Sequence, residues 1–411
     1  MKCMNGLRVK VIVIGGGAAG MIAAGTAAAA GAKVVLLEPN DRLGKKLLIT
    51  GKGRCNVTNN CSAEDVLKNV PRNGRFLYSC LNAFTPEQTM SFFESLGCAL
   101  KTERGNRVFP TSDQSSDVLH ALQRYLREHR VEIQRAKAES ILCRDGAVAG
   151  VETDQGLVYG RRVILCTGGC SYPLTGSTGD GYAMAEKLGH KIIDPVGSLV
   201  PLVENGPWCA KIQGLALKNV AVKLLNQKGK AIFEDFGELL FTHFGLSGPT
   251  ILSASAHMNL KDTYSISIDL KPALDEQKLD QRMLRDFEQY QNRDIHHTLQ
   301  ELYPKSLIPV ILERAGIDPA TKTNSVTRQQ RRALLEFTKK FTVSIAGKRP
   351  VEEAIITSGG VQVRDVDPKT MESRLVRGLY FAGEILDVDA YTGGFNLQIA
   401  WSTGALAGGS I

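Results

Sequence analysis

Three glycines near the start of the chain are spaced so that a backbone turn could hold phosphates. Gly15, Gly17 and Gly20 fit a G-x-G-x-x-G pattern, and Glu38 ends the next apolar run. In this pattern the first glycine makes a tight turn, the second lets the backbone approach a pyrophosphate, and the third lets a helix pack on a strand. The carboxylate of Glu38 could accept hydrogen bonds from ribose hydroxyls. These residues therefore predict dinucleotide binding.

The sequence around the glycines supplies the elements that such a turn needs. Apolar residues 9–14 predict a strand, alanine-rich residues 17–30 a helix, and residues 33–38 a second strand. The helix would direct free N–H groups and a positive dipole end at the phosphates. A signal peptide is the alternative, because residues 11–32 are almost uncharged. The glycines inside that run and the soluble sequence behind it argue against a signal peptide.

A second glycine turn lies close to the other end of the chain. The segment GLYFAGEILDVDAYTGGFNLQIAWSTG, residues 378–404, predicts a strand and then a glycine turn that opens a helix. A fold that needs both ends of the chain to complete one site is more typical of FAD than of a simple nicotinamide dehydrogenase. We therefore interpret the two ends as halves of one flavin site.

Composition favours a cytoplasmic enzyme. The 411 residues are 43% hydrophobic, which suits a buried core and two or three domains. No apolar stretch beyond the N-terminal run is long enough to span a membrane, so we expect no membrane partner. Nine cysteines at irregular spacing indicate reduced thiols and not a disulfide framework. The absence of a C-x-x-C pair counts against a disulfide-reductase mechanism.

Charge does not by itself indicate a nucleic-acid partner. The net charge of +8 is spread along the chain. Only residues 322–340 are locally dense in lysine and arginine, and we interpret them as the solvated face of a helix. The sequence thus predicts a small-molecule substrate and no nucleic acid, and it does not predict an oligomeric state.

The central part of the chain suggests an insertion. Helices are expected at 85–96 and 115–130. Residues 131–159 should form an antiparallel β-meander of short strands with a turn at Arg144-Asp145-Gly146, followed by a strand at 161–169 and a glycine turn into a helix at 175–190. After Asp194-Pro195 the character changes, with strands at 216–225 and 265–270 and then helices from 275. The pattern predicts an α/β protein with a discontinuous Rossmann-type FAD-binding domain, residues 1–194 and 347–411, around an inserted domain, residues 195–346.

Four motifs resemble those of one bacterial flavoprotein family, which includes aminoacetone oxidases and a 3-dehydro-bile-acid Δ4,6-reductase. They are TGKGRCNVTN (50–59), FTHFGLSGP (241–249), TSGGV (357–361) and AGEILDVDAYTGGFNLQIAWSTG (382–404). The resemblance covers essentially the whole chain. It implies non-covalent FAD, a flavin domain related to those of glutathione reductase and fumarate reductase, and an inserted mixed β-barrel and helical domain that caps the flavin. It does not imply one substrate.

The resemblance also implies a set of FAD-binding residues. The first glycine turn would hold the pyrophosphate, Glu384 would reach ribityl or ribose hydroxyls, and the backbone of Ala138 would meet adenine. The helix start after Gly394 would face N1 and the C2 carbonyl of the flavin, where backbone donors stabilise the reduced anion. A lysine- and arginine-containing loop, residues 41–60, would wrap the cofactor. The full set is Gly15, Gly17, Ala18, Ala19, Gly20, Glu38, Lys45, Lys46, Gly51, Arg54, Ala138, Gly383, Glu384, Gly393, Gly394, Phe395, Asn396 and Leu397.

Catalytic residues are harder to assign. Cys55 and Asn56 in the wrapping loop should lie near the flavin, although a packed thiol is the commoner reading of Cys55. His243 is the best-placed histidine, with a structural hydrogen bond as its alternative and with Ser247 capping the helix that follows. Tyr391, before the second glycine turn, could present its hydroxyl to a substrate carbonyl. Tyr172 is a further candidate, and Asp387 and Asp389 are expected to fix their loop.

Three functions remain open. The first is NAD(P)H-linked reduction of a C=C bond conjugated to a carbonyl in a 3-oxo, bile-acid or steroid-like compound. The second is oxidation of small amines by oxygen, and the third is action on tRNA, which the dispersed basic residues disfavour. We favour the first because an insertion of this size could enclose a bulky apolar substrate. Since a second G-x-G-x-x-G is absent, NAD(P)H would have to bind transiently.

Overall fold

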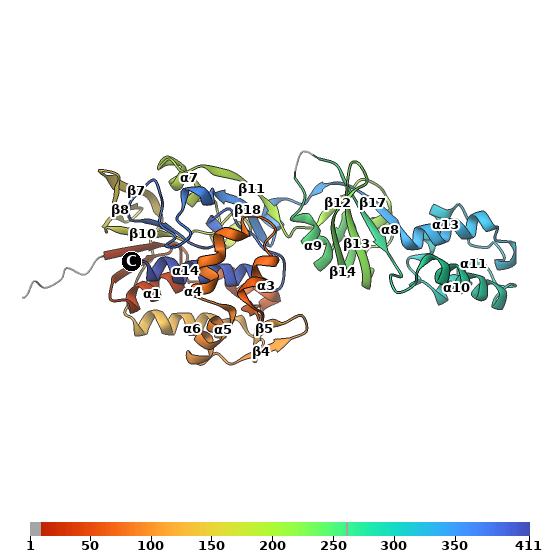
Figure 1. Cartoon of the computed structure of the whole chain (residues 1–411), viewed down its shortest axis with the longest axis horizontal. Helices are drawn as coiled ribbons and strands as arrows, with labels where there is room; N and C mark the ends of the chain where they lie inside the picture. Colours follow the sequence, from red (N-terminus) through yellow and green to blue (C-terminus); the bar gives the residue numbers. More distant parts are fainter. Residues whose placement is uncertain (1–9, 260–261) are drawn as a thin grey trace, which may run out of the picture. The chain divides into compact units, whose positions relative to one another are not determined.

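The chain folds into two compact units. The computed structural model describes residues 10–259 and 262–411 (Figure 1). One unit runs to Ser198 and resumes at Val351, and the other is Leu199–Pro350. Val9, where the first strand was expected to begin, and the eight residues before it lie outside the described residues.

The expected domain limits fall inside strands. Strand β11 (Ile192–Ser198) crosses the limit expected after residue 194, and β17 (Phe341–Lys348) crosses the one expected after residue 346. Asp194-Pro195 lies within an irregularity in the pairing of β11 with β18 (Ile356–Val361), so this dipeptide interrupts the ladder without ending the strand. Whether the two units fold as independent domains stays a prediction.

A five-stranded parallel sheet forms the centre of the first unit. Its order is β19 (Leu379–Phe381), β10 (Arg162–Leu165), β1 (Lys10–Ile14), β2 (Lys33–Leu37) and β6 (Glu132–Gln134), and every neighbouring pair is parallel. The continuous apolar runs of β1 and β2 suit a sheet that is covered on both faces. This arrangement confirms the predicted Rossmann-type fold.

The short strands expected at 131–159 divide between two sheets. The first of them, β6, pairs with β2, so its assignment to the antiparallel meander was wrong. Strands β7 (Ala138–Arg144), β8 (Ala147–Thr153) and β9 (Gly156–Tyr159) form the three-stranded antiparallel sheet. Asp145 and Gly146 take positive φ values of 52° and 71°, which confirms the predicted turn between β7 and β8.

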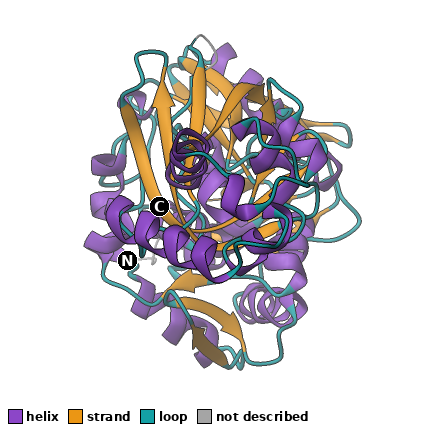
Figure 2. Cartoon of the chain, turned by 90° about the vertical axis from the view of Figure 1, so that its right-hand side faces the viewer, coloured by secondary structure: helices purple, strands orange, loops and turns teal. Residues whose placement is uncertain are grey.

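The predicted helices of this unit are present and labelled in Figure 1, and Figure 2 distinguishes helices from strands by colour. They are α1 (Ala18–Ala29), α5 (Pro86–Ser95), α6 (Ser115–Glu128), α7 (Asp180–Lys187) and α14 (Phe395–Gly409). Helix α5 begins at a capping box formed by Thr85 and Gln88. The remaining elements are α2 (Lys45–Ile49), β3 (Thr58–Asn59), α3 (Ala63–Lys68), α4 (Tyr78–Ala83), β4 (Leu100–Glu103) and β5 (Arg107–Pro110).

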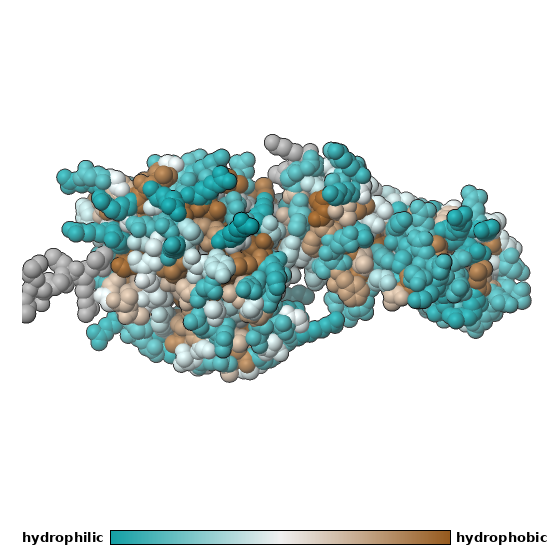
Figure 3. All heavy atoms as spheres, in the orientation of Figure 1, coloured by the Kyte–Doolittle hydropathy of each residue, from teal (hydrophilic) through white to brown (hydrophobic). Residues whose placement is uncertain are grey.

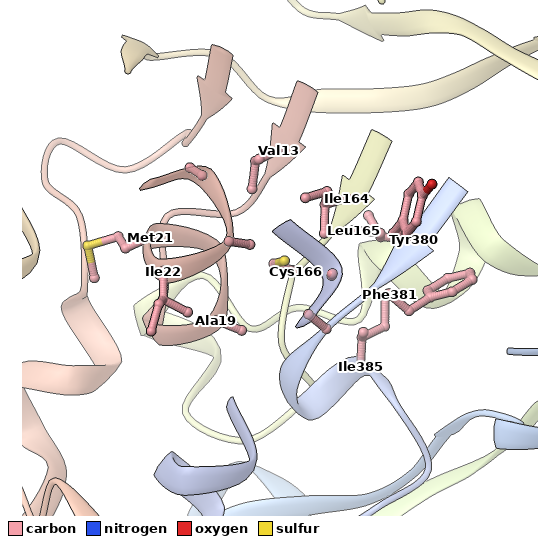
Figure 4. Close-up of a cluster of buried hydrophobic side chains, with 14 of the residues drawn as sticks. Val13, Ala19, Met21, Ile22, Ile164, Leu165, Cys166, Tyr380, Phe381 and Ile385 are labelled. Atoms are coloured by element: carbon pink, nitrogen blue, oxygen red, sulfur yellow. The ribbon is translucent and has the colours of Figure 1, made fainter. Parts of the chain in front are cut away.

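Helices α1 and α14, from opposite ends of the sequence, pack in close contact. A Cβ added to Gly404 would lie 2.5 Å from Cγ2 of Ile22 and 2.6 Å from the carbonyl oxygen of Ala19. One added to Gly408 would lie 2.4 Å from the carbonyl oxygen of Ala23. Glycine at these two positions lets the backbones approach. Figure 4 shows the surrounding core, with side chains from α1, β1, β10 and β19.

The inserted unit is a closed barrel with helices between its strands in the sequence, which agrees with the predicted mixed β-barrel and helical domain. The barrel order is β12 (Leu202–Glu204), β15 (Gly245–Ser247), β14 (Ala231–Thr242), β13 (Ala216–Asn226), β16 (Tyr264–Asp269) and β17. Alternate residues such as Val222, Ile266 and Val343 point into its fully buried core. The helices are α8 (Trp208–Lys211), α9 (Pro249–Ser255), α10 (Glu276–Gln289), α11 (Ile295–Thr298), α12 (Ile308–Ala315) and α13 (Arg328–Lys339).

Two details of the inserted unit bear on the sequence predictions. Helix α9 begins at Gly248 without a side-chain cap and Ser247 ends β15, so the predicted cap by Ser247 was wrong. The basic stretch 322–340 includes α13, whose Arg328 and Arg332 are exposed while Leu334 is buried. Figure 3 shows a mostly hydrophilic surface over the helices of this unit. In residues 10–259 and 262–411, no helix is long and apolar enough to cross a membrane.

The contact between α1 and α14 predicts unequal effects of two neighbouring substitutions on stability. G408A should lower the free energy of unfolding by about 1–3 kcal/mol, because the new methyl group would overlap the Ala23 carbonyl. G409A should change it by less than about 1 kcal/mol, because its Cβ would lie 3.9 Å from the nearest atom, Cγ2 of Thr26. Urea unfolding of both variants measures the difference. Equal stabilities would contradict the close helix contact.

Candidate functional site

The first glycine turn is closed on its protein side and open on the other. Gly15 follows β1 with φ of 102°, and a Cβ there would lie 2.5 Å from the carbonyl oxygen of Cys166. A Cβ on Gly20 would lie 1.8 Å from the carbonyl oxygen of Gly15. By contrast, a Cβ on Gly17 would meet no atom of the described residues within 4 Å, and among these residues no side chain caps α1 at Gly17. The uncapped N–H groups of α1 therefore face open space that suits a phosphate.

Glu38 holds this turn from the end of β2. Its side chain is buried, and Oε2 accepts a hydrogen bond of 2.7 Å from the Gly16 N–H. Oε1 accepts hydrogen bonds from the backbone N–H and side-chain Nδ2 of Asn40, at 2.9 and 2.7 Å. Glu38 thus orders the phosphate-side backbone, and its contact with a ribose stays a prediction. Sequence reasoning missed Asn40, for which the G-x-G-x-x-G template gives no signal.

Lys46 and Glu384 are ion-paired to each other. Nζ of Lys46 lies 2.6 Å from Oε2 of Glu384 and 2.6 Å from Oγ of Ser171. Oε1 of Glu384 accepts hydrogen bonds from the Ser171 hydroxyl, 2.9 Å, and from the Thr357 N–H, 2.8 Å. The pair thus joins α2 to the short 3-10 helix Gly383–Ile385 that follows β19. The TSGGV motif was the available signal for Thr357, and Ser171 was missed.

The other cations of the expected wrapping loop also have carboxylate partners. Lys45 pairs with Asp41 at 2.8 Å, and this hydrogen bond lowers the pKa of Asp41. Arg54 donates to Asp113 and Glu103 at distances of 2.5 to 2.8 Å and lies over the ring of Phe109. These contacts stabilise the loop, and the roles of Lys45 and Arg54 toward phosphate stay predictions.

The second glycine turn opens α14 against the wrapping loop. Gly393 and Gly394 have φ of 130° and 97°, and a Cβ on Gly394 would lie 2.4 Å from the carbonyl oxygen of Thr58. Asn59 Nδ2 donates a hydrogen bond of 3.0 Å to the Gly393 carbonyl. The turn makes no side-chain cap for α14. The first-turn N–H groups, those of Phe395, Asn396 and Leu397, therefore have no intrahelical acceptor and can serve a ligand.

The side chain of Asn396 also makes hydrogen bonds within the protein. Its Oδ1 accepts a hydrogen bond from the Ala390 N–H, 2.8 Å, and its Nδ2 donates to the Ala390 carbonyl, 2.7 Å. The side chain of Asn396 thus fixes the loop that leads into the turn. The Tyr391 N–H in the same loop donates to the Asn69 carbonyl at 3.0 Å, and the Tyr391 side chain is partly buried.

The cysteine and asparagine of the wrapping loop differ sharply. Cys55 is fully buried, and burial raises the pKa of its thiol to about 12, which favours a packed neutral thiol over a nucleophile. The Oδ1 atom of Asn56 is buried and, within the part of the chain that the structure describes, has no hydrogen-bond partner. Oγ1 of Thr167 is likewise buried and without a hydrogen-bond partner among the described residues; Thr167 lies just past the carboxyl end of β10. The sequence analysis did not identify this residue.

The remaining predicted residues are distributed over both units. Gly383 follows β19 with φ of 78°, and a Cβ there would lie 2.8 Å from the Cβ of Ala19. Ala18 begins α1, Gly51 precedes Asn56 in the wrapping loop, and Ala138 opens β7. His243 belongs to the inserted unit, where it is exposed in the turn between β14 and β15 with its ring against Phe244. A catalytic role for His243 stays a prediction.

Comparison with known proteins agrees with this geometry. A family model described as the HI0933-like protein Rossmann domain matches residues 9–410. The chain is 33% identical over 383 residues to the 3-dehydro-bile acid delta(4,6)-reductase of Clostridium scindens, which covers 92% of each chain. The chain belongs to the HI0933-like family. This HI0933-like chain is also 29% identical over 400 residues to the ribosomal RNA dihydrouridine synthase of Escherichia coli, with 96% of each chain covered.

A solved structure shares the fold. The 3-ketosteroid delta1-dehydrogenase of Sterolibacterium denitrificans superposes with a TM-score of 0.51 at 14% identity, over 98% of each chain. The family match and the fold place this chain among FAD-dependent oxidoreductases, which confirms the resemblance drawn from the motifs.

The residues present fit FAD. Buried polar atoms without partners are rare in native proteins, and a ligand is a common explanation for them. Asn56 Oδ1 and Thr167 Oγ1 are such atoms, and each belongs to a loop that contacts a glycine turn. The open backbone at Gly17 and the two uncapped helix starts add donors for an anionic cofactor.

The open space at Gly17 predicts a selective loss of cofactor. G17A should fold normally, because Gly17 has an extended backbone with φ of −79° and room for a methyl group. It should bind FAD at least about tenfold more weakly, since the methyl group blocks the approach of a pyrophosphate. Fluorescence titration of the apoprotein with FAD measures the affinity, and G347A, which also has no atom within 4 Å, is the matched control. Unchanged affinity in G17A would contradict the assignment.

Burial of Cys55 predicts that its thiol is inert. At pH 8 a thiol with a pKa near 12 holds a thiolate fraction of only about 10⁻⁴. Cys143 is exposed and should react with a thiol reagent in the native protein, whereas Cys55 should react only after denaturation. Peptide mapping by mass spectrometry separates the two sites. Rapid labelling of Cys55 in the native protein would revive it as a catalytic candidate.

Proposed function

We propose that this protein uses NAD(P)H and FAD to reduce a C=C bond conjugated to a carbonyl, with a 3-oxo, bile-acid or steroid-like compound as substrate. The observation that carries the proposal is the 33% identity, over 92% of both chains, to an enzyme named for such a reduction. The motifs of the flavin unit are all present in this chain, from the first glycine turn to α14.

The names of the relatives describe one type of bond chemistry. A Δ4,6-reductase of a 3-dehydro bile acid saturates C=C bonds conjugated to a carbonyl. Dihydrouridine is uridine whose C5=C6 bond, conjugated to the C4 carbonyl, has been saturated. In each case a hydride can add to a carbon that is conjugated with the carbonyl, which is the β carbon or, for the more distant bond of a 4,6-dienone, the δ carbon. A proton then adds to the neighbouring carbon. This common bond type supports reduction over amine oxidation, which stays the alternative.

The proposed reaction assigns a role to each group of residues in the site. FAD supplies the hydride when it is bound. The turn at Gly15–Gly20 would hold its pyrophosphate, and the N–H groups at the start of α14 would stabilise negative charge at the reducible end. Asn56 and Thr167 would use their unpartnered atoms on the cofactor. Tyr391 would face the substrate, since its loop leads directly into the turn of α14.

A second candidate is the reduction of a uridine in ribosomal RNA. Two relatives, at 29% and 28% identity, are named ribosomal RNA dihydrouridine synthases. Exposed cations such as Arg328 and Arg332 on α13 could contact phosphates, although Arg331 and Lys339 of the same helix are paired with Asp280 and Asp269. The expected absence of a nucleic-acid partner therefore stays a prediction.

Anaerobic mixing separates reduction from oxidation. We expect NADPH or NADH to bleach the visible absorbance of bound FAD, and a steroid with 3-oxo-Δ4,6 unsaturation to restore it faster than buffer alone. G17A, which should hold less FAD at the same concentrations, is the control. If aminoacetone bleaches the flavin and neither nicotinamide does, the proposal is wrong and the amine-oxidase reading replaces it.

The same assay distinguishes the two substrates. Reduced enzyme is offered either the steroid or ribosomal RNA that lacks dihydrouridine, and mass spectrometry measures the saturated product. Saturated steroid without dihydrouridine supports the first candidate. Dihydrouridine without saturated steroid supports the second.

A further inference from the structure

We propose that Arg72 forms an oxyanion subsite that receives the carbonyl oxygen of the substrate and is held in position by Asp389 and Ser358. This inference rests on the proposed function and adds to it a contact between the protein and the substrate. Arg72 lies between α3 and the short 3-10 helix Gly74–Leu77, in a segment that carries none of the motifs noted in the sequence.

One edge of the Arg72 guanidinium is anchored. Its Nη2 donates to Oγ of Ser358 and lies 3.3 Å from Oδ1 of Asp389. The Asp389 side chain is 1% exposed, whereas that of Arg72 is 46% exposed. A guanidinium has five N–H groups, and these two contacts use a single nitrogen. Among the described residues, the remaining donors are thus left for a ligand on the exposed side.

The anchoring carboxylate is itself fixed. Oδ2 of Asp389 accepts a hydrogen bond of 2.6 Å from the Ser198 hydroxyl, and Oδ1 accepts one of 2.9 Å from the Ser358 hydroxyl. Asn73 adds a second tie, since its Nδ2 donates to the carbonyl and the carboxylate of Asp387, at 2.7 and 2.9 Å. Residues 72–73 are therefore clamped to residues 387–389, which limits the positions that the guanidinium can take.

The clamped loop leads to the start of α14. Ala390 is held by Asn396 in the first turn of α14, and Tyr391 N–H donates to Asn69 in the segment that precedes Arg72. The half-exposed cation thus belongs to the same connected group as the N–H donors expected at the reducible end of the flavin. We therefore expect a substrate that stacks on the reducible end of the flavin to place its carbonyl near Arg72 and Tyr391.

The proposed chemistry develops negative charge that a cation at this place would stabilise. Addition of a hydride, supplied by NAD(P)H through FAD, to the β carbon moves the C=C electron pair toward the carbonyl and leaves an enolate oxygen. A proton from solvent or an acid then adds to the α carbon and restores the carbonyl, so one hydride and one proton saturate one bond. A preorganised guanidinium beside that oxygen stabilises the charge as it develops.

Three variants of the FAD-loaded protein test the subsite. R72Q should slow the reoxidation of reduced enzyme by the unsaturated carbonyl substrate at least about 100-fold, the loss typical of one oxyanion donor. Its reduction by NAD(P)H should be unchanged, because that step does not involve the substrate carbonyl. R72K should keep an intermediate rate. R75Q, which removes an exposed arginine of the adjacent short helix, is the matched control and should behave as wild type.

A binding probe gives a readout that needs no turnover. A phenolate mimics an enolate, and its stacking on oxidised FAD produces a long-wavelength charge-transfer band. We expect R72Q to weaken phenolate binding at least tenfold and R75Q to leave it unchanged. Equal phenolate affinity and equal reoxidation rates in wild type and R72Q would overturn the subsite.

A double variant separates binding from support of the fold. R72Q leaves Asp389 as a buried unpaired carboxylate, and R72Q/D389N replaces the ion pair by neutral groups of similar shape. The double variant should recover stability without recovering substrate reduction. Recovery of both would make Arg72 a purely structural residue and overturn the proposal. Failure of wild type to reduce any conjugated C=C bond would instead refute the proposed function. The phenolate affinities of wild type and R72Q would then be the test of the subsite.

Discussion

The close contact between α1 and α14 is the constraint on which the candidate site depends. Gly404 lies against Ala19 and Gly408 against Ala23, so the two helices run parallel and in constant register. Phe395 therefore starts α14 about two turns, roughly 12 Å at 1.5 Å per residue, before the level at which α1 begins. Two uncapped helix starts that are offset along the helix axes suit one extended cofactor that carries charge at two points. A side chain larger than hydrogen at Gly404 or Gly408 would push the two helices apart.

Strand β18 organises the charges around these helix starts. Two neighbouring residues of this strand bond different carboxylates: the Thr357 backbone N–H donates to Glu384, and the Ser358 hydroxyl donates to Asp389. Glu384 pairs with Lys46, and both side chains are largely covered, at 12% and 22% exposure. Asp389 is covered while its partner Arg72 is not. Burial of both partners suits an ion pair with a structural role. Where only the carboxylate is buried, the cation is held in place while its exposed side can contact a ligand.

The sequence predicted those parts of the fold that local patterns encode. The G-x-G-x-x-G turn, the strand and helix that flank it, and the glycine start of α14 each follow from a few adjacent residues, and each is present. Pairings between distant residues were not predictable. Nothing in the neighbourhood of Lys46 or Arg54 indicates that carboxylates from Glu384 or Glu103 neutralise them. The same applies to Asn56 and Thr167, whose unpartnered atoms are visible only once the packing around them is known.

The presence of the inserted unit does not distinguish a steroid-like substrate from ribosomal RNA. The relatives named for a bile acid and for ribosomal RNA match this chain over 92% and 96% of their own lengths, so both span the insertion. An enclosed apolar substrate is therefore not implied by the size of that unit. What the two substrates share is a carbonyl conjugated to the bond that is reduced. A subsite for that carbonyl belongs to the flavin unit, where Arg72 and Asp389 lie, and not to the barrel and its helices.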